Sequence, residues 1–246
     1  MASVVLVHGI RTSASMWRTH ERLLAEAGVP HLAVDLPGHG ARREETFTLE
    51  RCRAVLDEAV ASVPPPHVVA GLSLGSYVAA DWAATTTGPE ALLLASCGTR
   101  PRGVGLTGYL ALASLIGRLP DRGLGLHTWS ARRVLGPEVA ADLLEGGVAL
   151  DAMVPTLRAL SGFDLLGALA HVDAPVWFVN GAWDHFRVEE RRVVEAARAA
   201  TLVVVPGAGH LVALDRPEAF VRVLVDVARQ ADVTWRARSR ARSGRR

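Results

Sequence analysis

A serine, an aspartate and a histidine stand in this chain where their types and spacing could carry out acyl transfer. Ser73 lies in the sequence AGLSLG (70–75), directly after the apolar run 67–70. A serine on a sharp turn between a strand and a helix projects its hydroxyl from the end of a sheet, at some cost in backbone strain. Glycines two residues to either side carry no Cβ that could collide with the neighbouring backbone. The pattern predicts that Ser73 is a nucleophile.

A nucleophilic serine needs a base, and the base needs a carboxylate to orient it. His210 follows the glycine-rich sequence PGAG (206–209), which lets the chain turn so that the imidazole can reach a serine hydroxyl. Asp184 lies in NGAWDH (180–185), after the apolar run 175–179. A carboxylate there could fix the tautomer of the histidine and stabilise the imidazolium. We therefore predict a catalytic triad of Ser73, His210 and Asp184.

Acyl transfer also needs hydrogen-bond donors for the oxyanion. Leu74 follows the nucleophile, so its backbone N–H is one candidate. The second should come from the loop after the first apolar run, in VHGI (7–10), where Ile10 N–H is the natural donor. Donors of this kind stabilise a transition state by about 3–4 kcal/mol each. We expect Ile10 and Leu74 to form the oxyanion hole.

Other residues could compete for these roles. His185 is adjacent to Asp184 and too close in sequence to be its partner, so His210 is the better base. Asp164 is placed to begin a short helix as its N-cap, and Asp173 precedes a proline in a turn. Asp184 is therefore the better acid.

Five further residues are candidates for substrate binding. Arg11 could bind a carboxylate of the substrate, although an exposed arginine that faces solvent is the more common case. The other four, Trp129, Trp183, Phe186 and Leu211, could wall an apolar pocket. Trp17 is expected in the core. No histidine or cysteine cluster has the spacing of a metal site, and neither Cys52 nor Cys97 belongs to a C-x-x-C pair.

The order of apolar segments indicates how these residues are positioned. Six strand-like runs, dense in Val and Leu, occur at 3–7, 31–34, 67–70, 91–95, 175–179 and 201–205. Helix-like segments lie between them at 17–27, 49–62, 74–86, 189–199 and 216–230. Alternating strands and helices predict an α/β fold with a parallel sheet, covered by helices on both faces. Residues 1–97 and 173–232 would form the core of this fold.

One interval breaks the alternation. Residues 98–172 hold only short helical patterns, separated by Gly and Pro, at 106–118, 126–135, 137–149, 151–161 and 164–170. An insertion of this kind between two strands predicts a helical cap over the carboxyl edge of the sheet, where ligands of open α/β sheets bind.

The composition limits the classes of protein that fit. The chain has 246 residues, half of them hydrophobic, so one α/β domain could use the whole length. The charged residues comprise 27 basic and 25 acidic side chains, and the basic ones are all arginine. Six arginines lie in 236–246, which leaves 21 basic against 25 acidic residues in the rest of the chain. We expect residues 233–246 to form a basic disordered tail, without nucleic-acid binding.

The location of the protein is also an expectation from sequence. No apolar run approaches the length that spans a bilayer. Met1 leads almost directly into the first strand-like run, which leaves no room for a signal peptide. We expect a cytoplasmic monomer or homodimer that acts on a small molecule and has no membrane partner.

Five motifs together resemble those of the α/β-hydrolases, specifically a capped, esterase-like group of serine hydrolases. They are HG (8–9), DLPGHG (35–40), GLSLG (71–75), GAWD (181–184) and GAGH (207–210). The chain order Ser, Asp, His matches that fold. The resemblance implies structural roles for Asp35 and His39. It also implies a sheet of about six strands, because the chain lacks the first two strands of the family, as the plant methylesterase and hydroxynitrile lyase branch does.

The resemblance implies a serine hydrolase that cleaves a carboxylic ester, lactone or thioester of a small apolar substrate through an acyl-enzyme on Ser73. No cofactor is required. The alternatives are a C–C bond hydrolase or a biosynthetic cyclase with the same triad, and a non-catalytic small-molecule binding protein on the same fold. Dehalogenases and epoxide hydrolases of this fold need Asp at the position of Ser73. Hydroxynitrile lyases need a lysine, and this chain has none.

Overall fold

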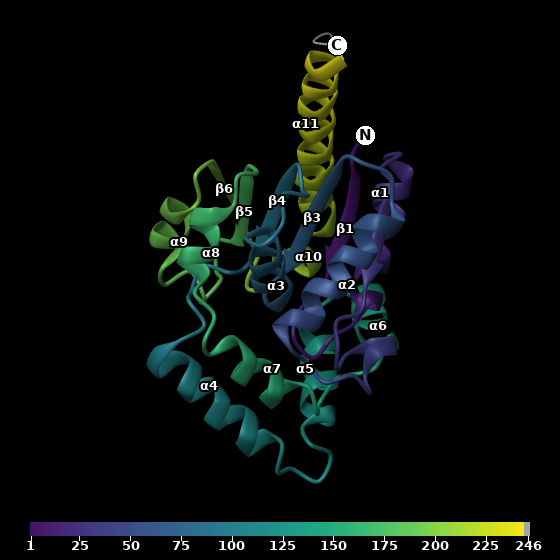
Figure 1. Ribbon diagram of the computed structural model, residues 1–246. Helices are drawn as coiled ribbons and strands as arrows, with labels where there is room; N and C mark the ends of the chain where they lie inside the picture. The colour runs from purple at the N-terminus through teal and green to yellow at the C-terminus, as the bar shows by residue number, and fades with distance from the viewer. Residues whose placement is uncertain (244–246) are drawn as a thin grey trace.

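The computed structural model contains one six-stranded parallel sheet, with the strand order β2-β1-β3-β4-β5-β6 (Figure 1). It describes residues 1–243, except for the side chain of Val104. The strands are β1 Ser3–Val7, β2 His31–Val34, β3 His67–Leu72, β4 Ala91–Ala95, β5 Val176–Gly181 and β6 Ala200–Val205. The prediction of a six-stranded parallel α/β sheet is confirmed, and each strand begins and ends within two residues of its expected bounds.

Alternate residues of each strand enter two separate hydrophobic cores. Val4 and Leu6 of β1 pack on one face of the sheet, while Val5 and Val7 pack on the other. Successive side chains of a strand point to opposite faces, so a strand that is apolar throughout fits only a sheet covered on both sides. This is why the predicted strands lack polar alternation.

Helices cover both faces. The first core also takes in buried side chains of α1 Arg18–Glu26 and α11 Pro217–Ser243. Trp17 is fully buried in this core and stacks on Phe220, as expected for a core residue. The second core takes in α2 Leu49–Ser62, α3 Leu74–Ala83 and α9 Glu190–Ala196. Of these, α3 is buried along its whole length, which suits the helix that follows Ser73.

The order of the strands reverses next to β1. The chain runs from β1 to β2 on one side and then returns to β3 on the other side. Ligands of open α/β sheets bind at the carboxyl ends of strands flanking such a switch point. Val7 of β1 is in register with Gly71 of β3, so the loop after β1 lies beside the turn that carries Ser73. The topology therefore brings the expected nucleophile and oxyanion loop together.

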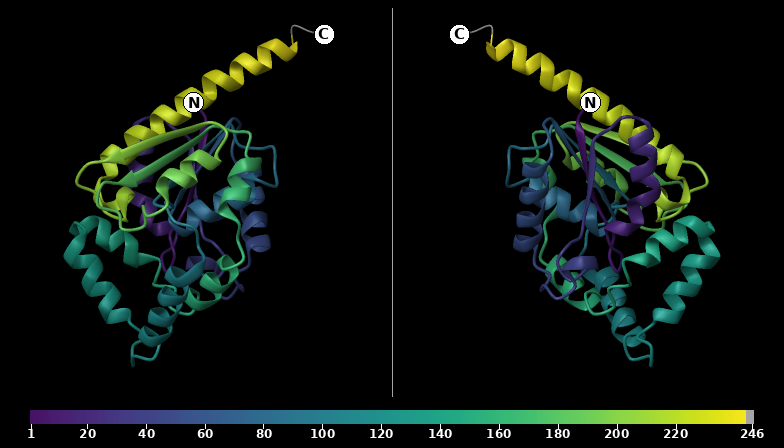
Figure 2. Two further views of the ribbon diagram at one scale, coloured as in Figure 1. Left: turned by 90° about the vertical axis from the view of Figure 1, so that its left-hand side faces the viewer. Right: turned by 90° about the vertical axis from the view of Figure 1, so that its right-hand side faces the viewer.

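Five helices lie between β4 and β5. They are α4 Gly103–Ile116, α5 Leu124–Val134, α6 Pro137–Glu145, α7 Met153–Leu160 and α8 Leu165–His171. Figures 1 and 2 show α4, α5 and α7 beyond one end of the sheet, opposite the free end of α11. In contrast, α8 packs beside α3 and α9, and its Leu165 and Leu169 are fully buried in the second core. The helix α8 therefore flanks the sheet rather than covering its end.

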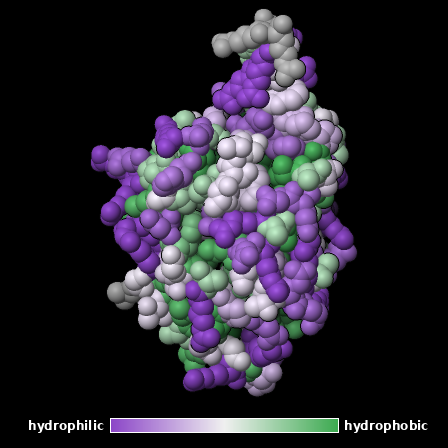
Figure 3. All heavy atoms as spheres, in the orientation of Figure 1, coloured by the Kyte–Doolittle hydropathy of each residue, from purple (hydrophilic) through white to green (hydrophobic). Residues whose placement is uncertain are grey.

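The expectation of a disordered tail is not met over residues 233–243. These residues continue α11 beyond the body of the molecule (Figure 2), and its buried positions end at Ala231. Alanine and arginine are strong helix formers, neither Gly nor Pro interrupts the segment before Gly244, and Arg236 pairs with Asp232 at 3.0 Å. Residues 244–246 lie outside the described part of the chain. In Figure 3 the projecting end is mostly hydrophilic.

Removal of residues 236–246 should leave the fold nearly as stable as before. The half-buried Trp235 stays in the chain, residues 236–243 are exposed apart from the partly buried Ser239, and exposed ion pairs such as Arg236–Asp232 contribute only about 0–1 kcal/mol. We expect an unchanged urea midpoint, but a change of formal net charge from positive to negative. Elution from a cation exchanger tests the second point. A large drop in the urea midpoint would show that the projecting helix supports the core.

No helix within residues 1–243 combines the length and the apolar character that a membrane crossing requires.

Candidate active site

Ser73 occupies a strained turn between β3 and α3. Its backbone has φ 52° and ψ −108°, a conformation that L-residues rarely adopt. The turn is held because Ser73 N–H donates to Ala95 O at 2.8 Å and Ser76 N–H donates to Ser73 O at 3.0 Å. Strain of about 1–3 kcal/mol of this kind persists only where the surroundings fix it, and it is common at functional sites.

Two glycines make this turn possible. A Cβ on Gly71 would lie 2.3 Å from the carbonyl carbon of Gly75, and a Cβ on Gly75 would lie 2.2 Å from Val7 O. Both contacts are with backbone atoms, which cannot move aside as a flexible side chain can. The glycines of the GLSLG sequence are therefore required by close packing between β1, β3 and α3.

Asp184 and His210 come from adjacent loops after β5 and β6. Gly181 is in register with Val205 at the ends of these strands. The loops remain paired beyond them, because Trp183 N–H donates to Ala208 O at 2.9 Å. A Cβ on Gly181 would lie 2.1 Å from Gly209 O, so only glycine allows this approach.

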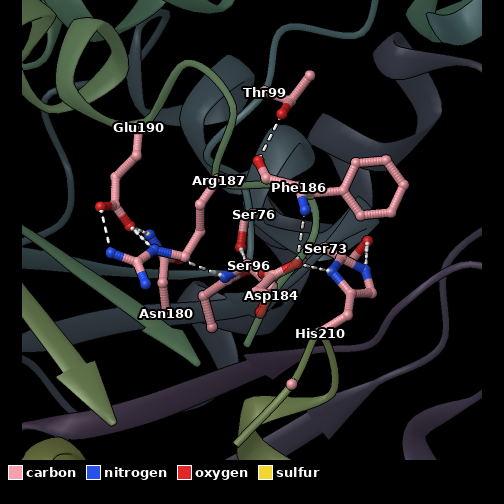
Figure 4. A network of polar contacts seen from close by, with 12 residues as sticks. Ser73, Ser76, Ser96, Thr99, Asn180, Asp184, Phe186, Arg187, Glu190 and His210 are labelled. Atoms are coloured by element: carbon pink, nitrogen blue, oxygen red, sulfur yellow. Dashed lines mark hydrogen bonds and ion pairs between the residues drawn. The ribbon is translucent and has the colours of Figure 1, made fainter. Parts of the chain in front are cut away.

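The three side chains form a continuous hydrogen-bonded chain (Figure 4). His210 Nδ1 lies 3.0 Å from Asp184 Oδ1, and His210 Nε2 lies 3.1 Å from Ser73 Oγ. A neutral imidazole that donates from Nδ1 to the carboxylate can accept the serine proton at Nε2. The Asp184 side chain is fully buried, while that of His210 is 20% exposed. The arrangement can deprotonate Ser73 and retain the proton.

Asp184 is held as a carboxylate. Burial alone would raise its pKa, but the hydrogen bond and charge of His210 lower the pKa below its ordinary value. The N–H of Phe186, which donates to Asp184 Oδ1 at 2.8 Å, acts in the same direction. An ionised Asp184 is what the tautomer of His210 requires.

A polar network behind the triad positions the loop of Asp184, and sequence reasoning did not find it. Asn180 accepts a hydrogen bond from Ser96 N–H at 3.0 Å and donates to Glu190 at 2.7 Å. Glu190 in turn pairs with Arg187 (Figure 4). Ser96 is left-handed, with φ 55°, at the end of β4. Ser96 was not among the predicted site residues, since its hydrogen bond to Asn180 arises from the pairing of β4 with β5.

Two backbone N–H groups are free to bind an oxyanion. Within residues 1–243, neither Ile10 N–H nor Leu74 N–H donates to a protein acceptor. Leu74 begins α3, where the first N–H groups of a helix lack partners and the helix dipole favours negative charge. Ile10 lies in the neighbouring loop, with its side chain packed against the cluster of Ala113, Met153 and Leu157.

His8 fixes the loop after β1, which carries Ile10, the expected oxyanion donor. Its Nδ1 donates to Gly9 O at 2.8 Å, and its Nε2 accepts from Leu36 N–H at 3.0 Å. Both bonds require the neutral ring. Burial, together with the nearby His39, lowers the pKa of His8 to about 3. Asp35 also has a structural role, as expected, because its carboxylate accepts from Ala14 N–H and Ala41 N–H.

Known proteins of one family are similar to this chain in sequence. The model of the alpha/beta hydrolase family matches residues 4–223. The pimeloyl-[acyl-carrier protein] methyl ester esterase of Stenotrophomonas maltophilia is 32% identical over 224 residues, covering 85% of this chain and 82% of the relative. The chain belongs to the alpha/beta hydrolase family. The predictions of this fold and of an ester-cleaving serine hydrolase are confirmed.

Solved structures of similar fold extend over most of this alpha/beta hydrolase. MenH from S. aureus has a TM-score of 0.77 at 17% identity, covering 94% of each chain. A thermophilic esterase from Thermogutta terrifontis has a TM-score of 0.74 at 21% identity, covering 94% of this chain and 90% of the other. At these identities the likeness concerns the fold.

The predicted pocket residues of the hydrolase differ in their burial and in their distance from the triad. The Phe186 ring lies 4.7 Å from the His210 ring, between centroids, so it borders the triad. Leu211 is half-buried against the first core. In contrast, Trp129 on α5 is 65% exposed and Trp183 is 79% exposed. The structure supports Phe186 as a wall residue and gives no such support to the two tryptophans, because most of each indole side chain is exposed.

The competing acids lie away from His210, whereas the competing base lies beside it. Asp164 is the N-cap residue of α8, as expected, and Asp173 pairs with Arg198. The ring of His185 lies 5.5 Å from that of His210, between centroids, without a hydrogen bond to the triad among the described residues. Within residues 1–243, no group of three or more His, Cys, Asp or Glu side chains is arranged to hold a metal ion.

Stability of this hydrolase should fall in mild acid. Burial lowers the pKa of His20 from 6.5 to about 4, so the unfolded chain takes up a proton first as the pH falls. The stability is complete above pH 6.5 and is lost between about pH 6.5 and 4. At 1.36 kcal/mol per unit, His20 should cost about 2 kcal/mol between pH 7.5 and 5. Urea unfolding at both pH values measures this loss.

The matched variant is His20→Phe, since the ring already packs against Trp17 and Phe220. It should lose less stability between the two pH values than the native chain does. An equal loss in both proteins would mean that other groups cause the acid sensitivity.

Proposed function

We propose that this alpha/beta hydrolase cleaves a carboxylic ester through an acyl-enzyme on Ser73. The observation that carries the proposal is the chain of contacts from Asp184 through His210 to Ser73, at 3.0 and 3.1 Å. Ser73 Oγ would attack the ester carbonyl while His210 Nε2 takes its proton. The N–H groups of Ile10 and Leu74 would bind the oxyanion of the tetrahedral intermediate.

Collapse of the intermediate would break the ester C–O bond. His210 would return its proton to the leaving oxygen, which departs as an alcohol. Water would then attack the acyl-enzyme with His210 as base, and a second collapse would release the carboxylic acid and restore Ser73. Asp184 would hold the imidazole in position throughout. The site needs no further group for this sequence of steps.

The identity of the substrate is the more specific part of the proposal. The S. maltophilia relative is named for the methyl ester of pimeloyl-[acyl-carrier protein]. We infer that an acyl methyl ester of this kind is the first candidate for this chain. The helices α4, α5 and α7 would act as a cap that encloses the acyl group. Of the expected range 98–172, the last helix, α8, flanks the sheet and lies outside this proposed cap. A cytoplasmic location and a monomeric or homodimeric state belong to the same proposal.

Two substrates test the proposal at its two levels. Purified protein should hydrolyse p-nitrophenyl butyrate, and it should release methanol from the methyl ester of pimeloyl-[acyl-carrier protein]. Both activities should disappear in Ser73→Ala. Hydrolysis of the first ester alone would confirm the reaction and reject the candidate substrate. Binding without turnover of either ester would favour a small-molecule binding protein.

A further inference from the structure

Arg11 stands in a backbone conformation that suits glycine. It has φ 67°, and its carbonyl oxygen accepts from Ala149 N–H at 3.1 Å, which ties the loop after β1 to the segment before α7. A non-glycine residue in this region is strained by about 1–3 kcal/mol. A large side chain at such a position suggests that the side chain has a use.

The guanidinium of Arg11 carries a partly buried charge without a counter-ion. Its Nε is buried and makes no hydrogen bond, and within residues 1–243 no carboxylate forms an ion pair with it. Burial lowers the pKa of Arg11. A buried charge is costly unless it is paired, so the free energy of this group would fall if an anion bound beside it.

Arg11 lines a cavity of about 230 Å³. The cavity lies between the end of α4, the turn that follows it, and the start of α7. Arg118 and Arg122 also line it, and the single acidic residue in its wall, Asp151, is already paired with Arg122. Apolar groups such as Met153 complete the wall. Positive charge between low-dielectric walls concentrates anions.

Two polar rings lie close enough to Arg11 for its charge to act on them. Burial is the main cause that lowers the pKa of His127 to about 4, and the charge of Arg11 is the second. His127 is therefore neutral. Its buried Nε2 has no partner among the described residues. Burial raises the pKa of Tyr109, and Arg11 opposes this rise. The centroid of the Tyr109 ring also lies 6.5 Å from that of the Phe186 ring, and the Phe186 ring lies beside that of His210.

Arg11 is therefore connected to the triad on two sides. It follows Ile10, the expected oxyanion donor, directly in sequence. The aromatic contacts lead from His210 through Phe186 to Tyr109. A larger hollow of about 560 Å³, between the loop after β2 and the end of α6, is lined by residues such as Asp35, Arg43 and Glu145, and neither Arg11 nor a triad residue is among them.

We propose that Arg11 binds an anionic oxygen group of the substrate, a carboxylate or a phosphate, in the cavity between α4 and α7. The inference rests on the proposed ester hydrolysis, because the anionic group is part of the ester. The substrate would be an ester whose apolar chain ends in this group. Arg11 would thus select substrates by charge while Ser73 performs the reaction.

The test compares charged and neutral esters of equal length. The mono-p-nitrophenyl esters of dicarboxylic acids with four to eight carbons carry a free carboxylate, and their ω-methyl esters do not. We expect kcat/KM to favour the charged ester at least tenfold at one chain length. Arg11→Gly should lower this ratio about 10- to 100-fold, mainly through KM, as expected when a charge-assisted hydrogen bond is lost.

The choice of variants keeps the test interpretable. Glycine suits φ 67°, so Arg11→Gly should fold and melt at the same temperature or higher. Arg133→Gln removes an exposed arginine of α5 that does not line the cavity, and it should keep the ratio of the native protein. An unchanged ratio in Arg11→Gly, or a preference of the native protein for the neutral esters, would overturn the proposal.

A binding measurement separates failure of this site from failure of the proposed function. Calorimetry on Ser73→Ala should detect adipate or butyl phosphate, and the tighter of the two identifies the anion. Both should bind at least tenfold more weakly when Arg11→Gly is added. If no ester is hydrolysed but this difference holds, ester hydrolysis fails and the anion site stands. If esters are hydrolysed and neither anion binds, the anion site fails alone.

Discussion

Replacement of Ser73 by alanine is expected to reduce kcat for ester hydrolysis by about 10⁴- to 10⁶-fold, the loss seen when a triad nucleophile is removed. The reason is that His210 Nε2, 3.1 Å from Ser73 Oγ, then has no hydroxyl to activate. The residual rate would come from binding and from the N–H groups of Ile10 and Leu74. Steady-state kinetics with p-nitrophenyl butyrate measures the loss.

Ser161→Ala is the matched control for this experiment. Ser161 is exposed after α7, and its hydroxyl donates only to Arg158 O, at 2.7 Å. The control should keep the native kcat. The Ser73 variant should also fold normally, because alanine keeps the backbone N–H that donates to Ala95 O. A kcat within tenfold of the native value in Ser73→Ala would remove Ser73 from the mechanism.

Asp184→Asn is expected to lower kcat by about 10⁴-fold without disturbing the fold, as an amide in place of a triad carboxylate does. The side chain is fully buried and its Oδ1 accepts from both His210 Nδ1 and Phe186 N–H. An amide whose oxygen keeps the position of Oδ1 would still accept from these two groups, but it carries no negative charge to stabilise the imidazolium. His210 would then accept the serine proton far less readily. The pH dependence of kcat should change along with its magnitude.

Asp164→Asn tests whether any carboxylate near the cap would have the same effect. Asp164 begins α8 and makes no cap hydrogen bond with its side chain. We expect activity within a factor of about two of the native value, in line with other substitutions away from a site. Equal losses in the two variants would contradict the assignment of Asp184.

Local patterns in the sequence predicted much of the site. Close backbone packing explains the glycines around Ser73 and in the loops of Asp184 and His210. A Cβ on Gly75 or Gly181 would lie about 2 Å from backbone atoms. Strand bounds were also predictable, since both faces of the sheet are buried. These features depend on residues within a few positions of one another.

Features that depend on distant contacts were not predictable. Trp129 and Trp183 looked like pocket walls, yet both are mostly exposed, because the docking of the helices between β4 and β5 decides their surroundings. The surroundings of Arg11 have the same origin, since α4 and α7 lie about a hundred residues or more away in sequence. An arginine-rich end without interleaved apolar residues after Trp235 predicts disorder, but Ala and Arg also favour helix.

Covalent labelling with a fluorophosphonate tests the central claim most directly. The reagent needs a serine activated by its histidine, and it leaves a phosphonyl group on that serine. We predict one adduct per chain in intact-mass measurements, located on Ser73 by peptide mapping, absent from Ser73→Ala and strongly slowed in Asp184→Asn. The absence of any adduct on the folded protein, or an adduct on another residue that persists in Ser73→Ala, would contradict the account.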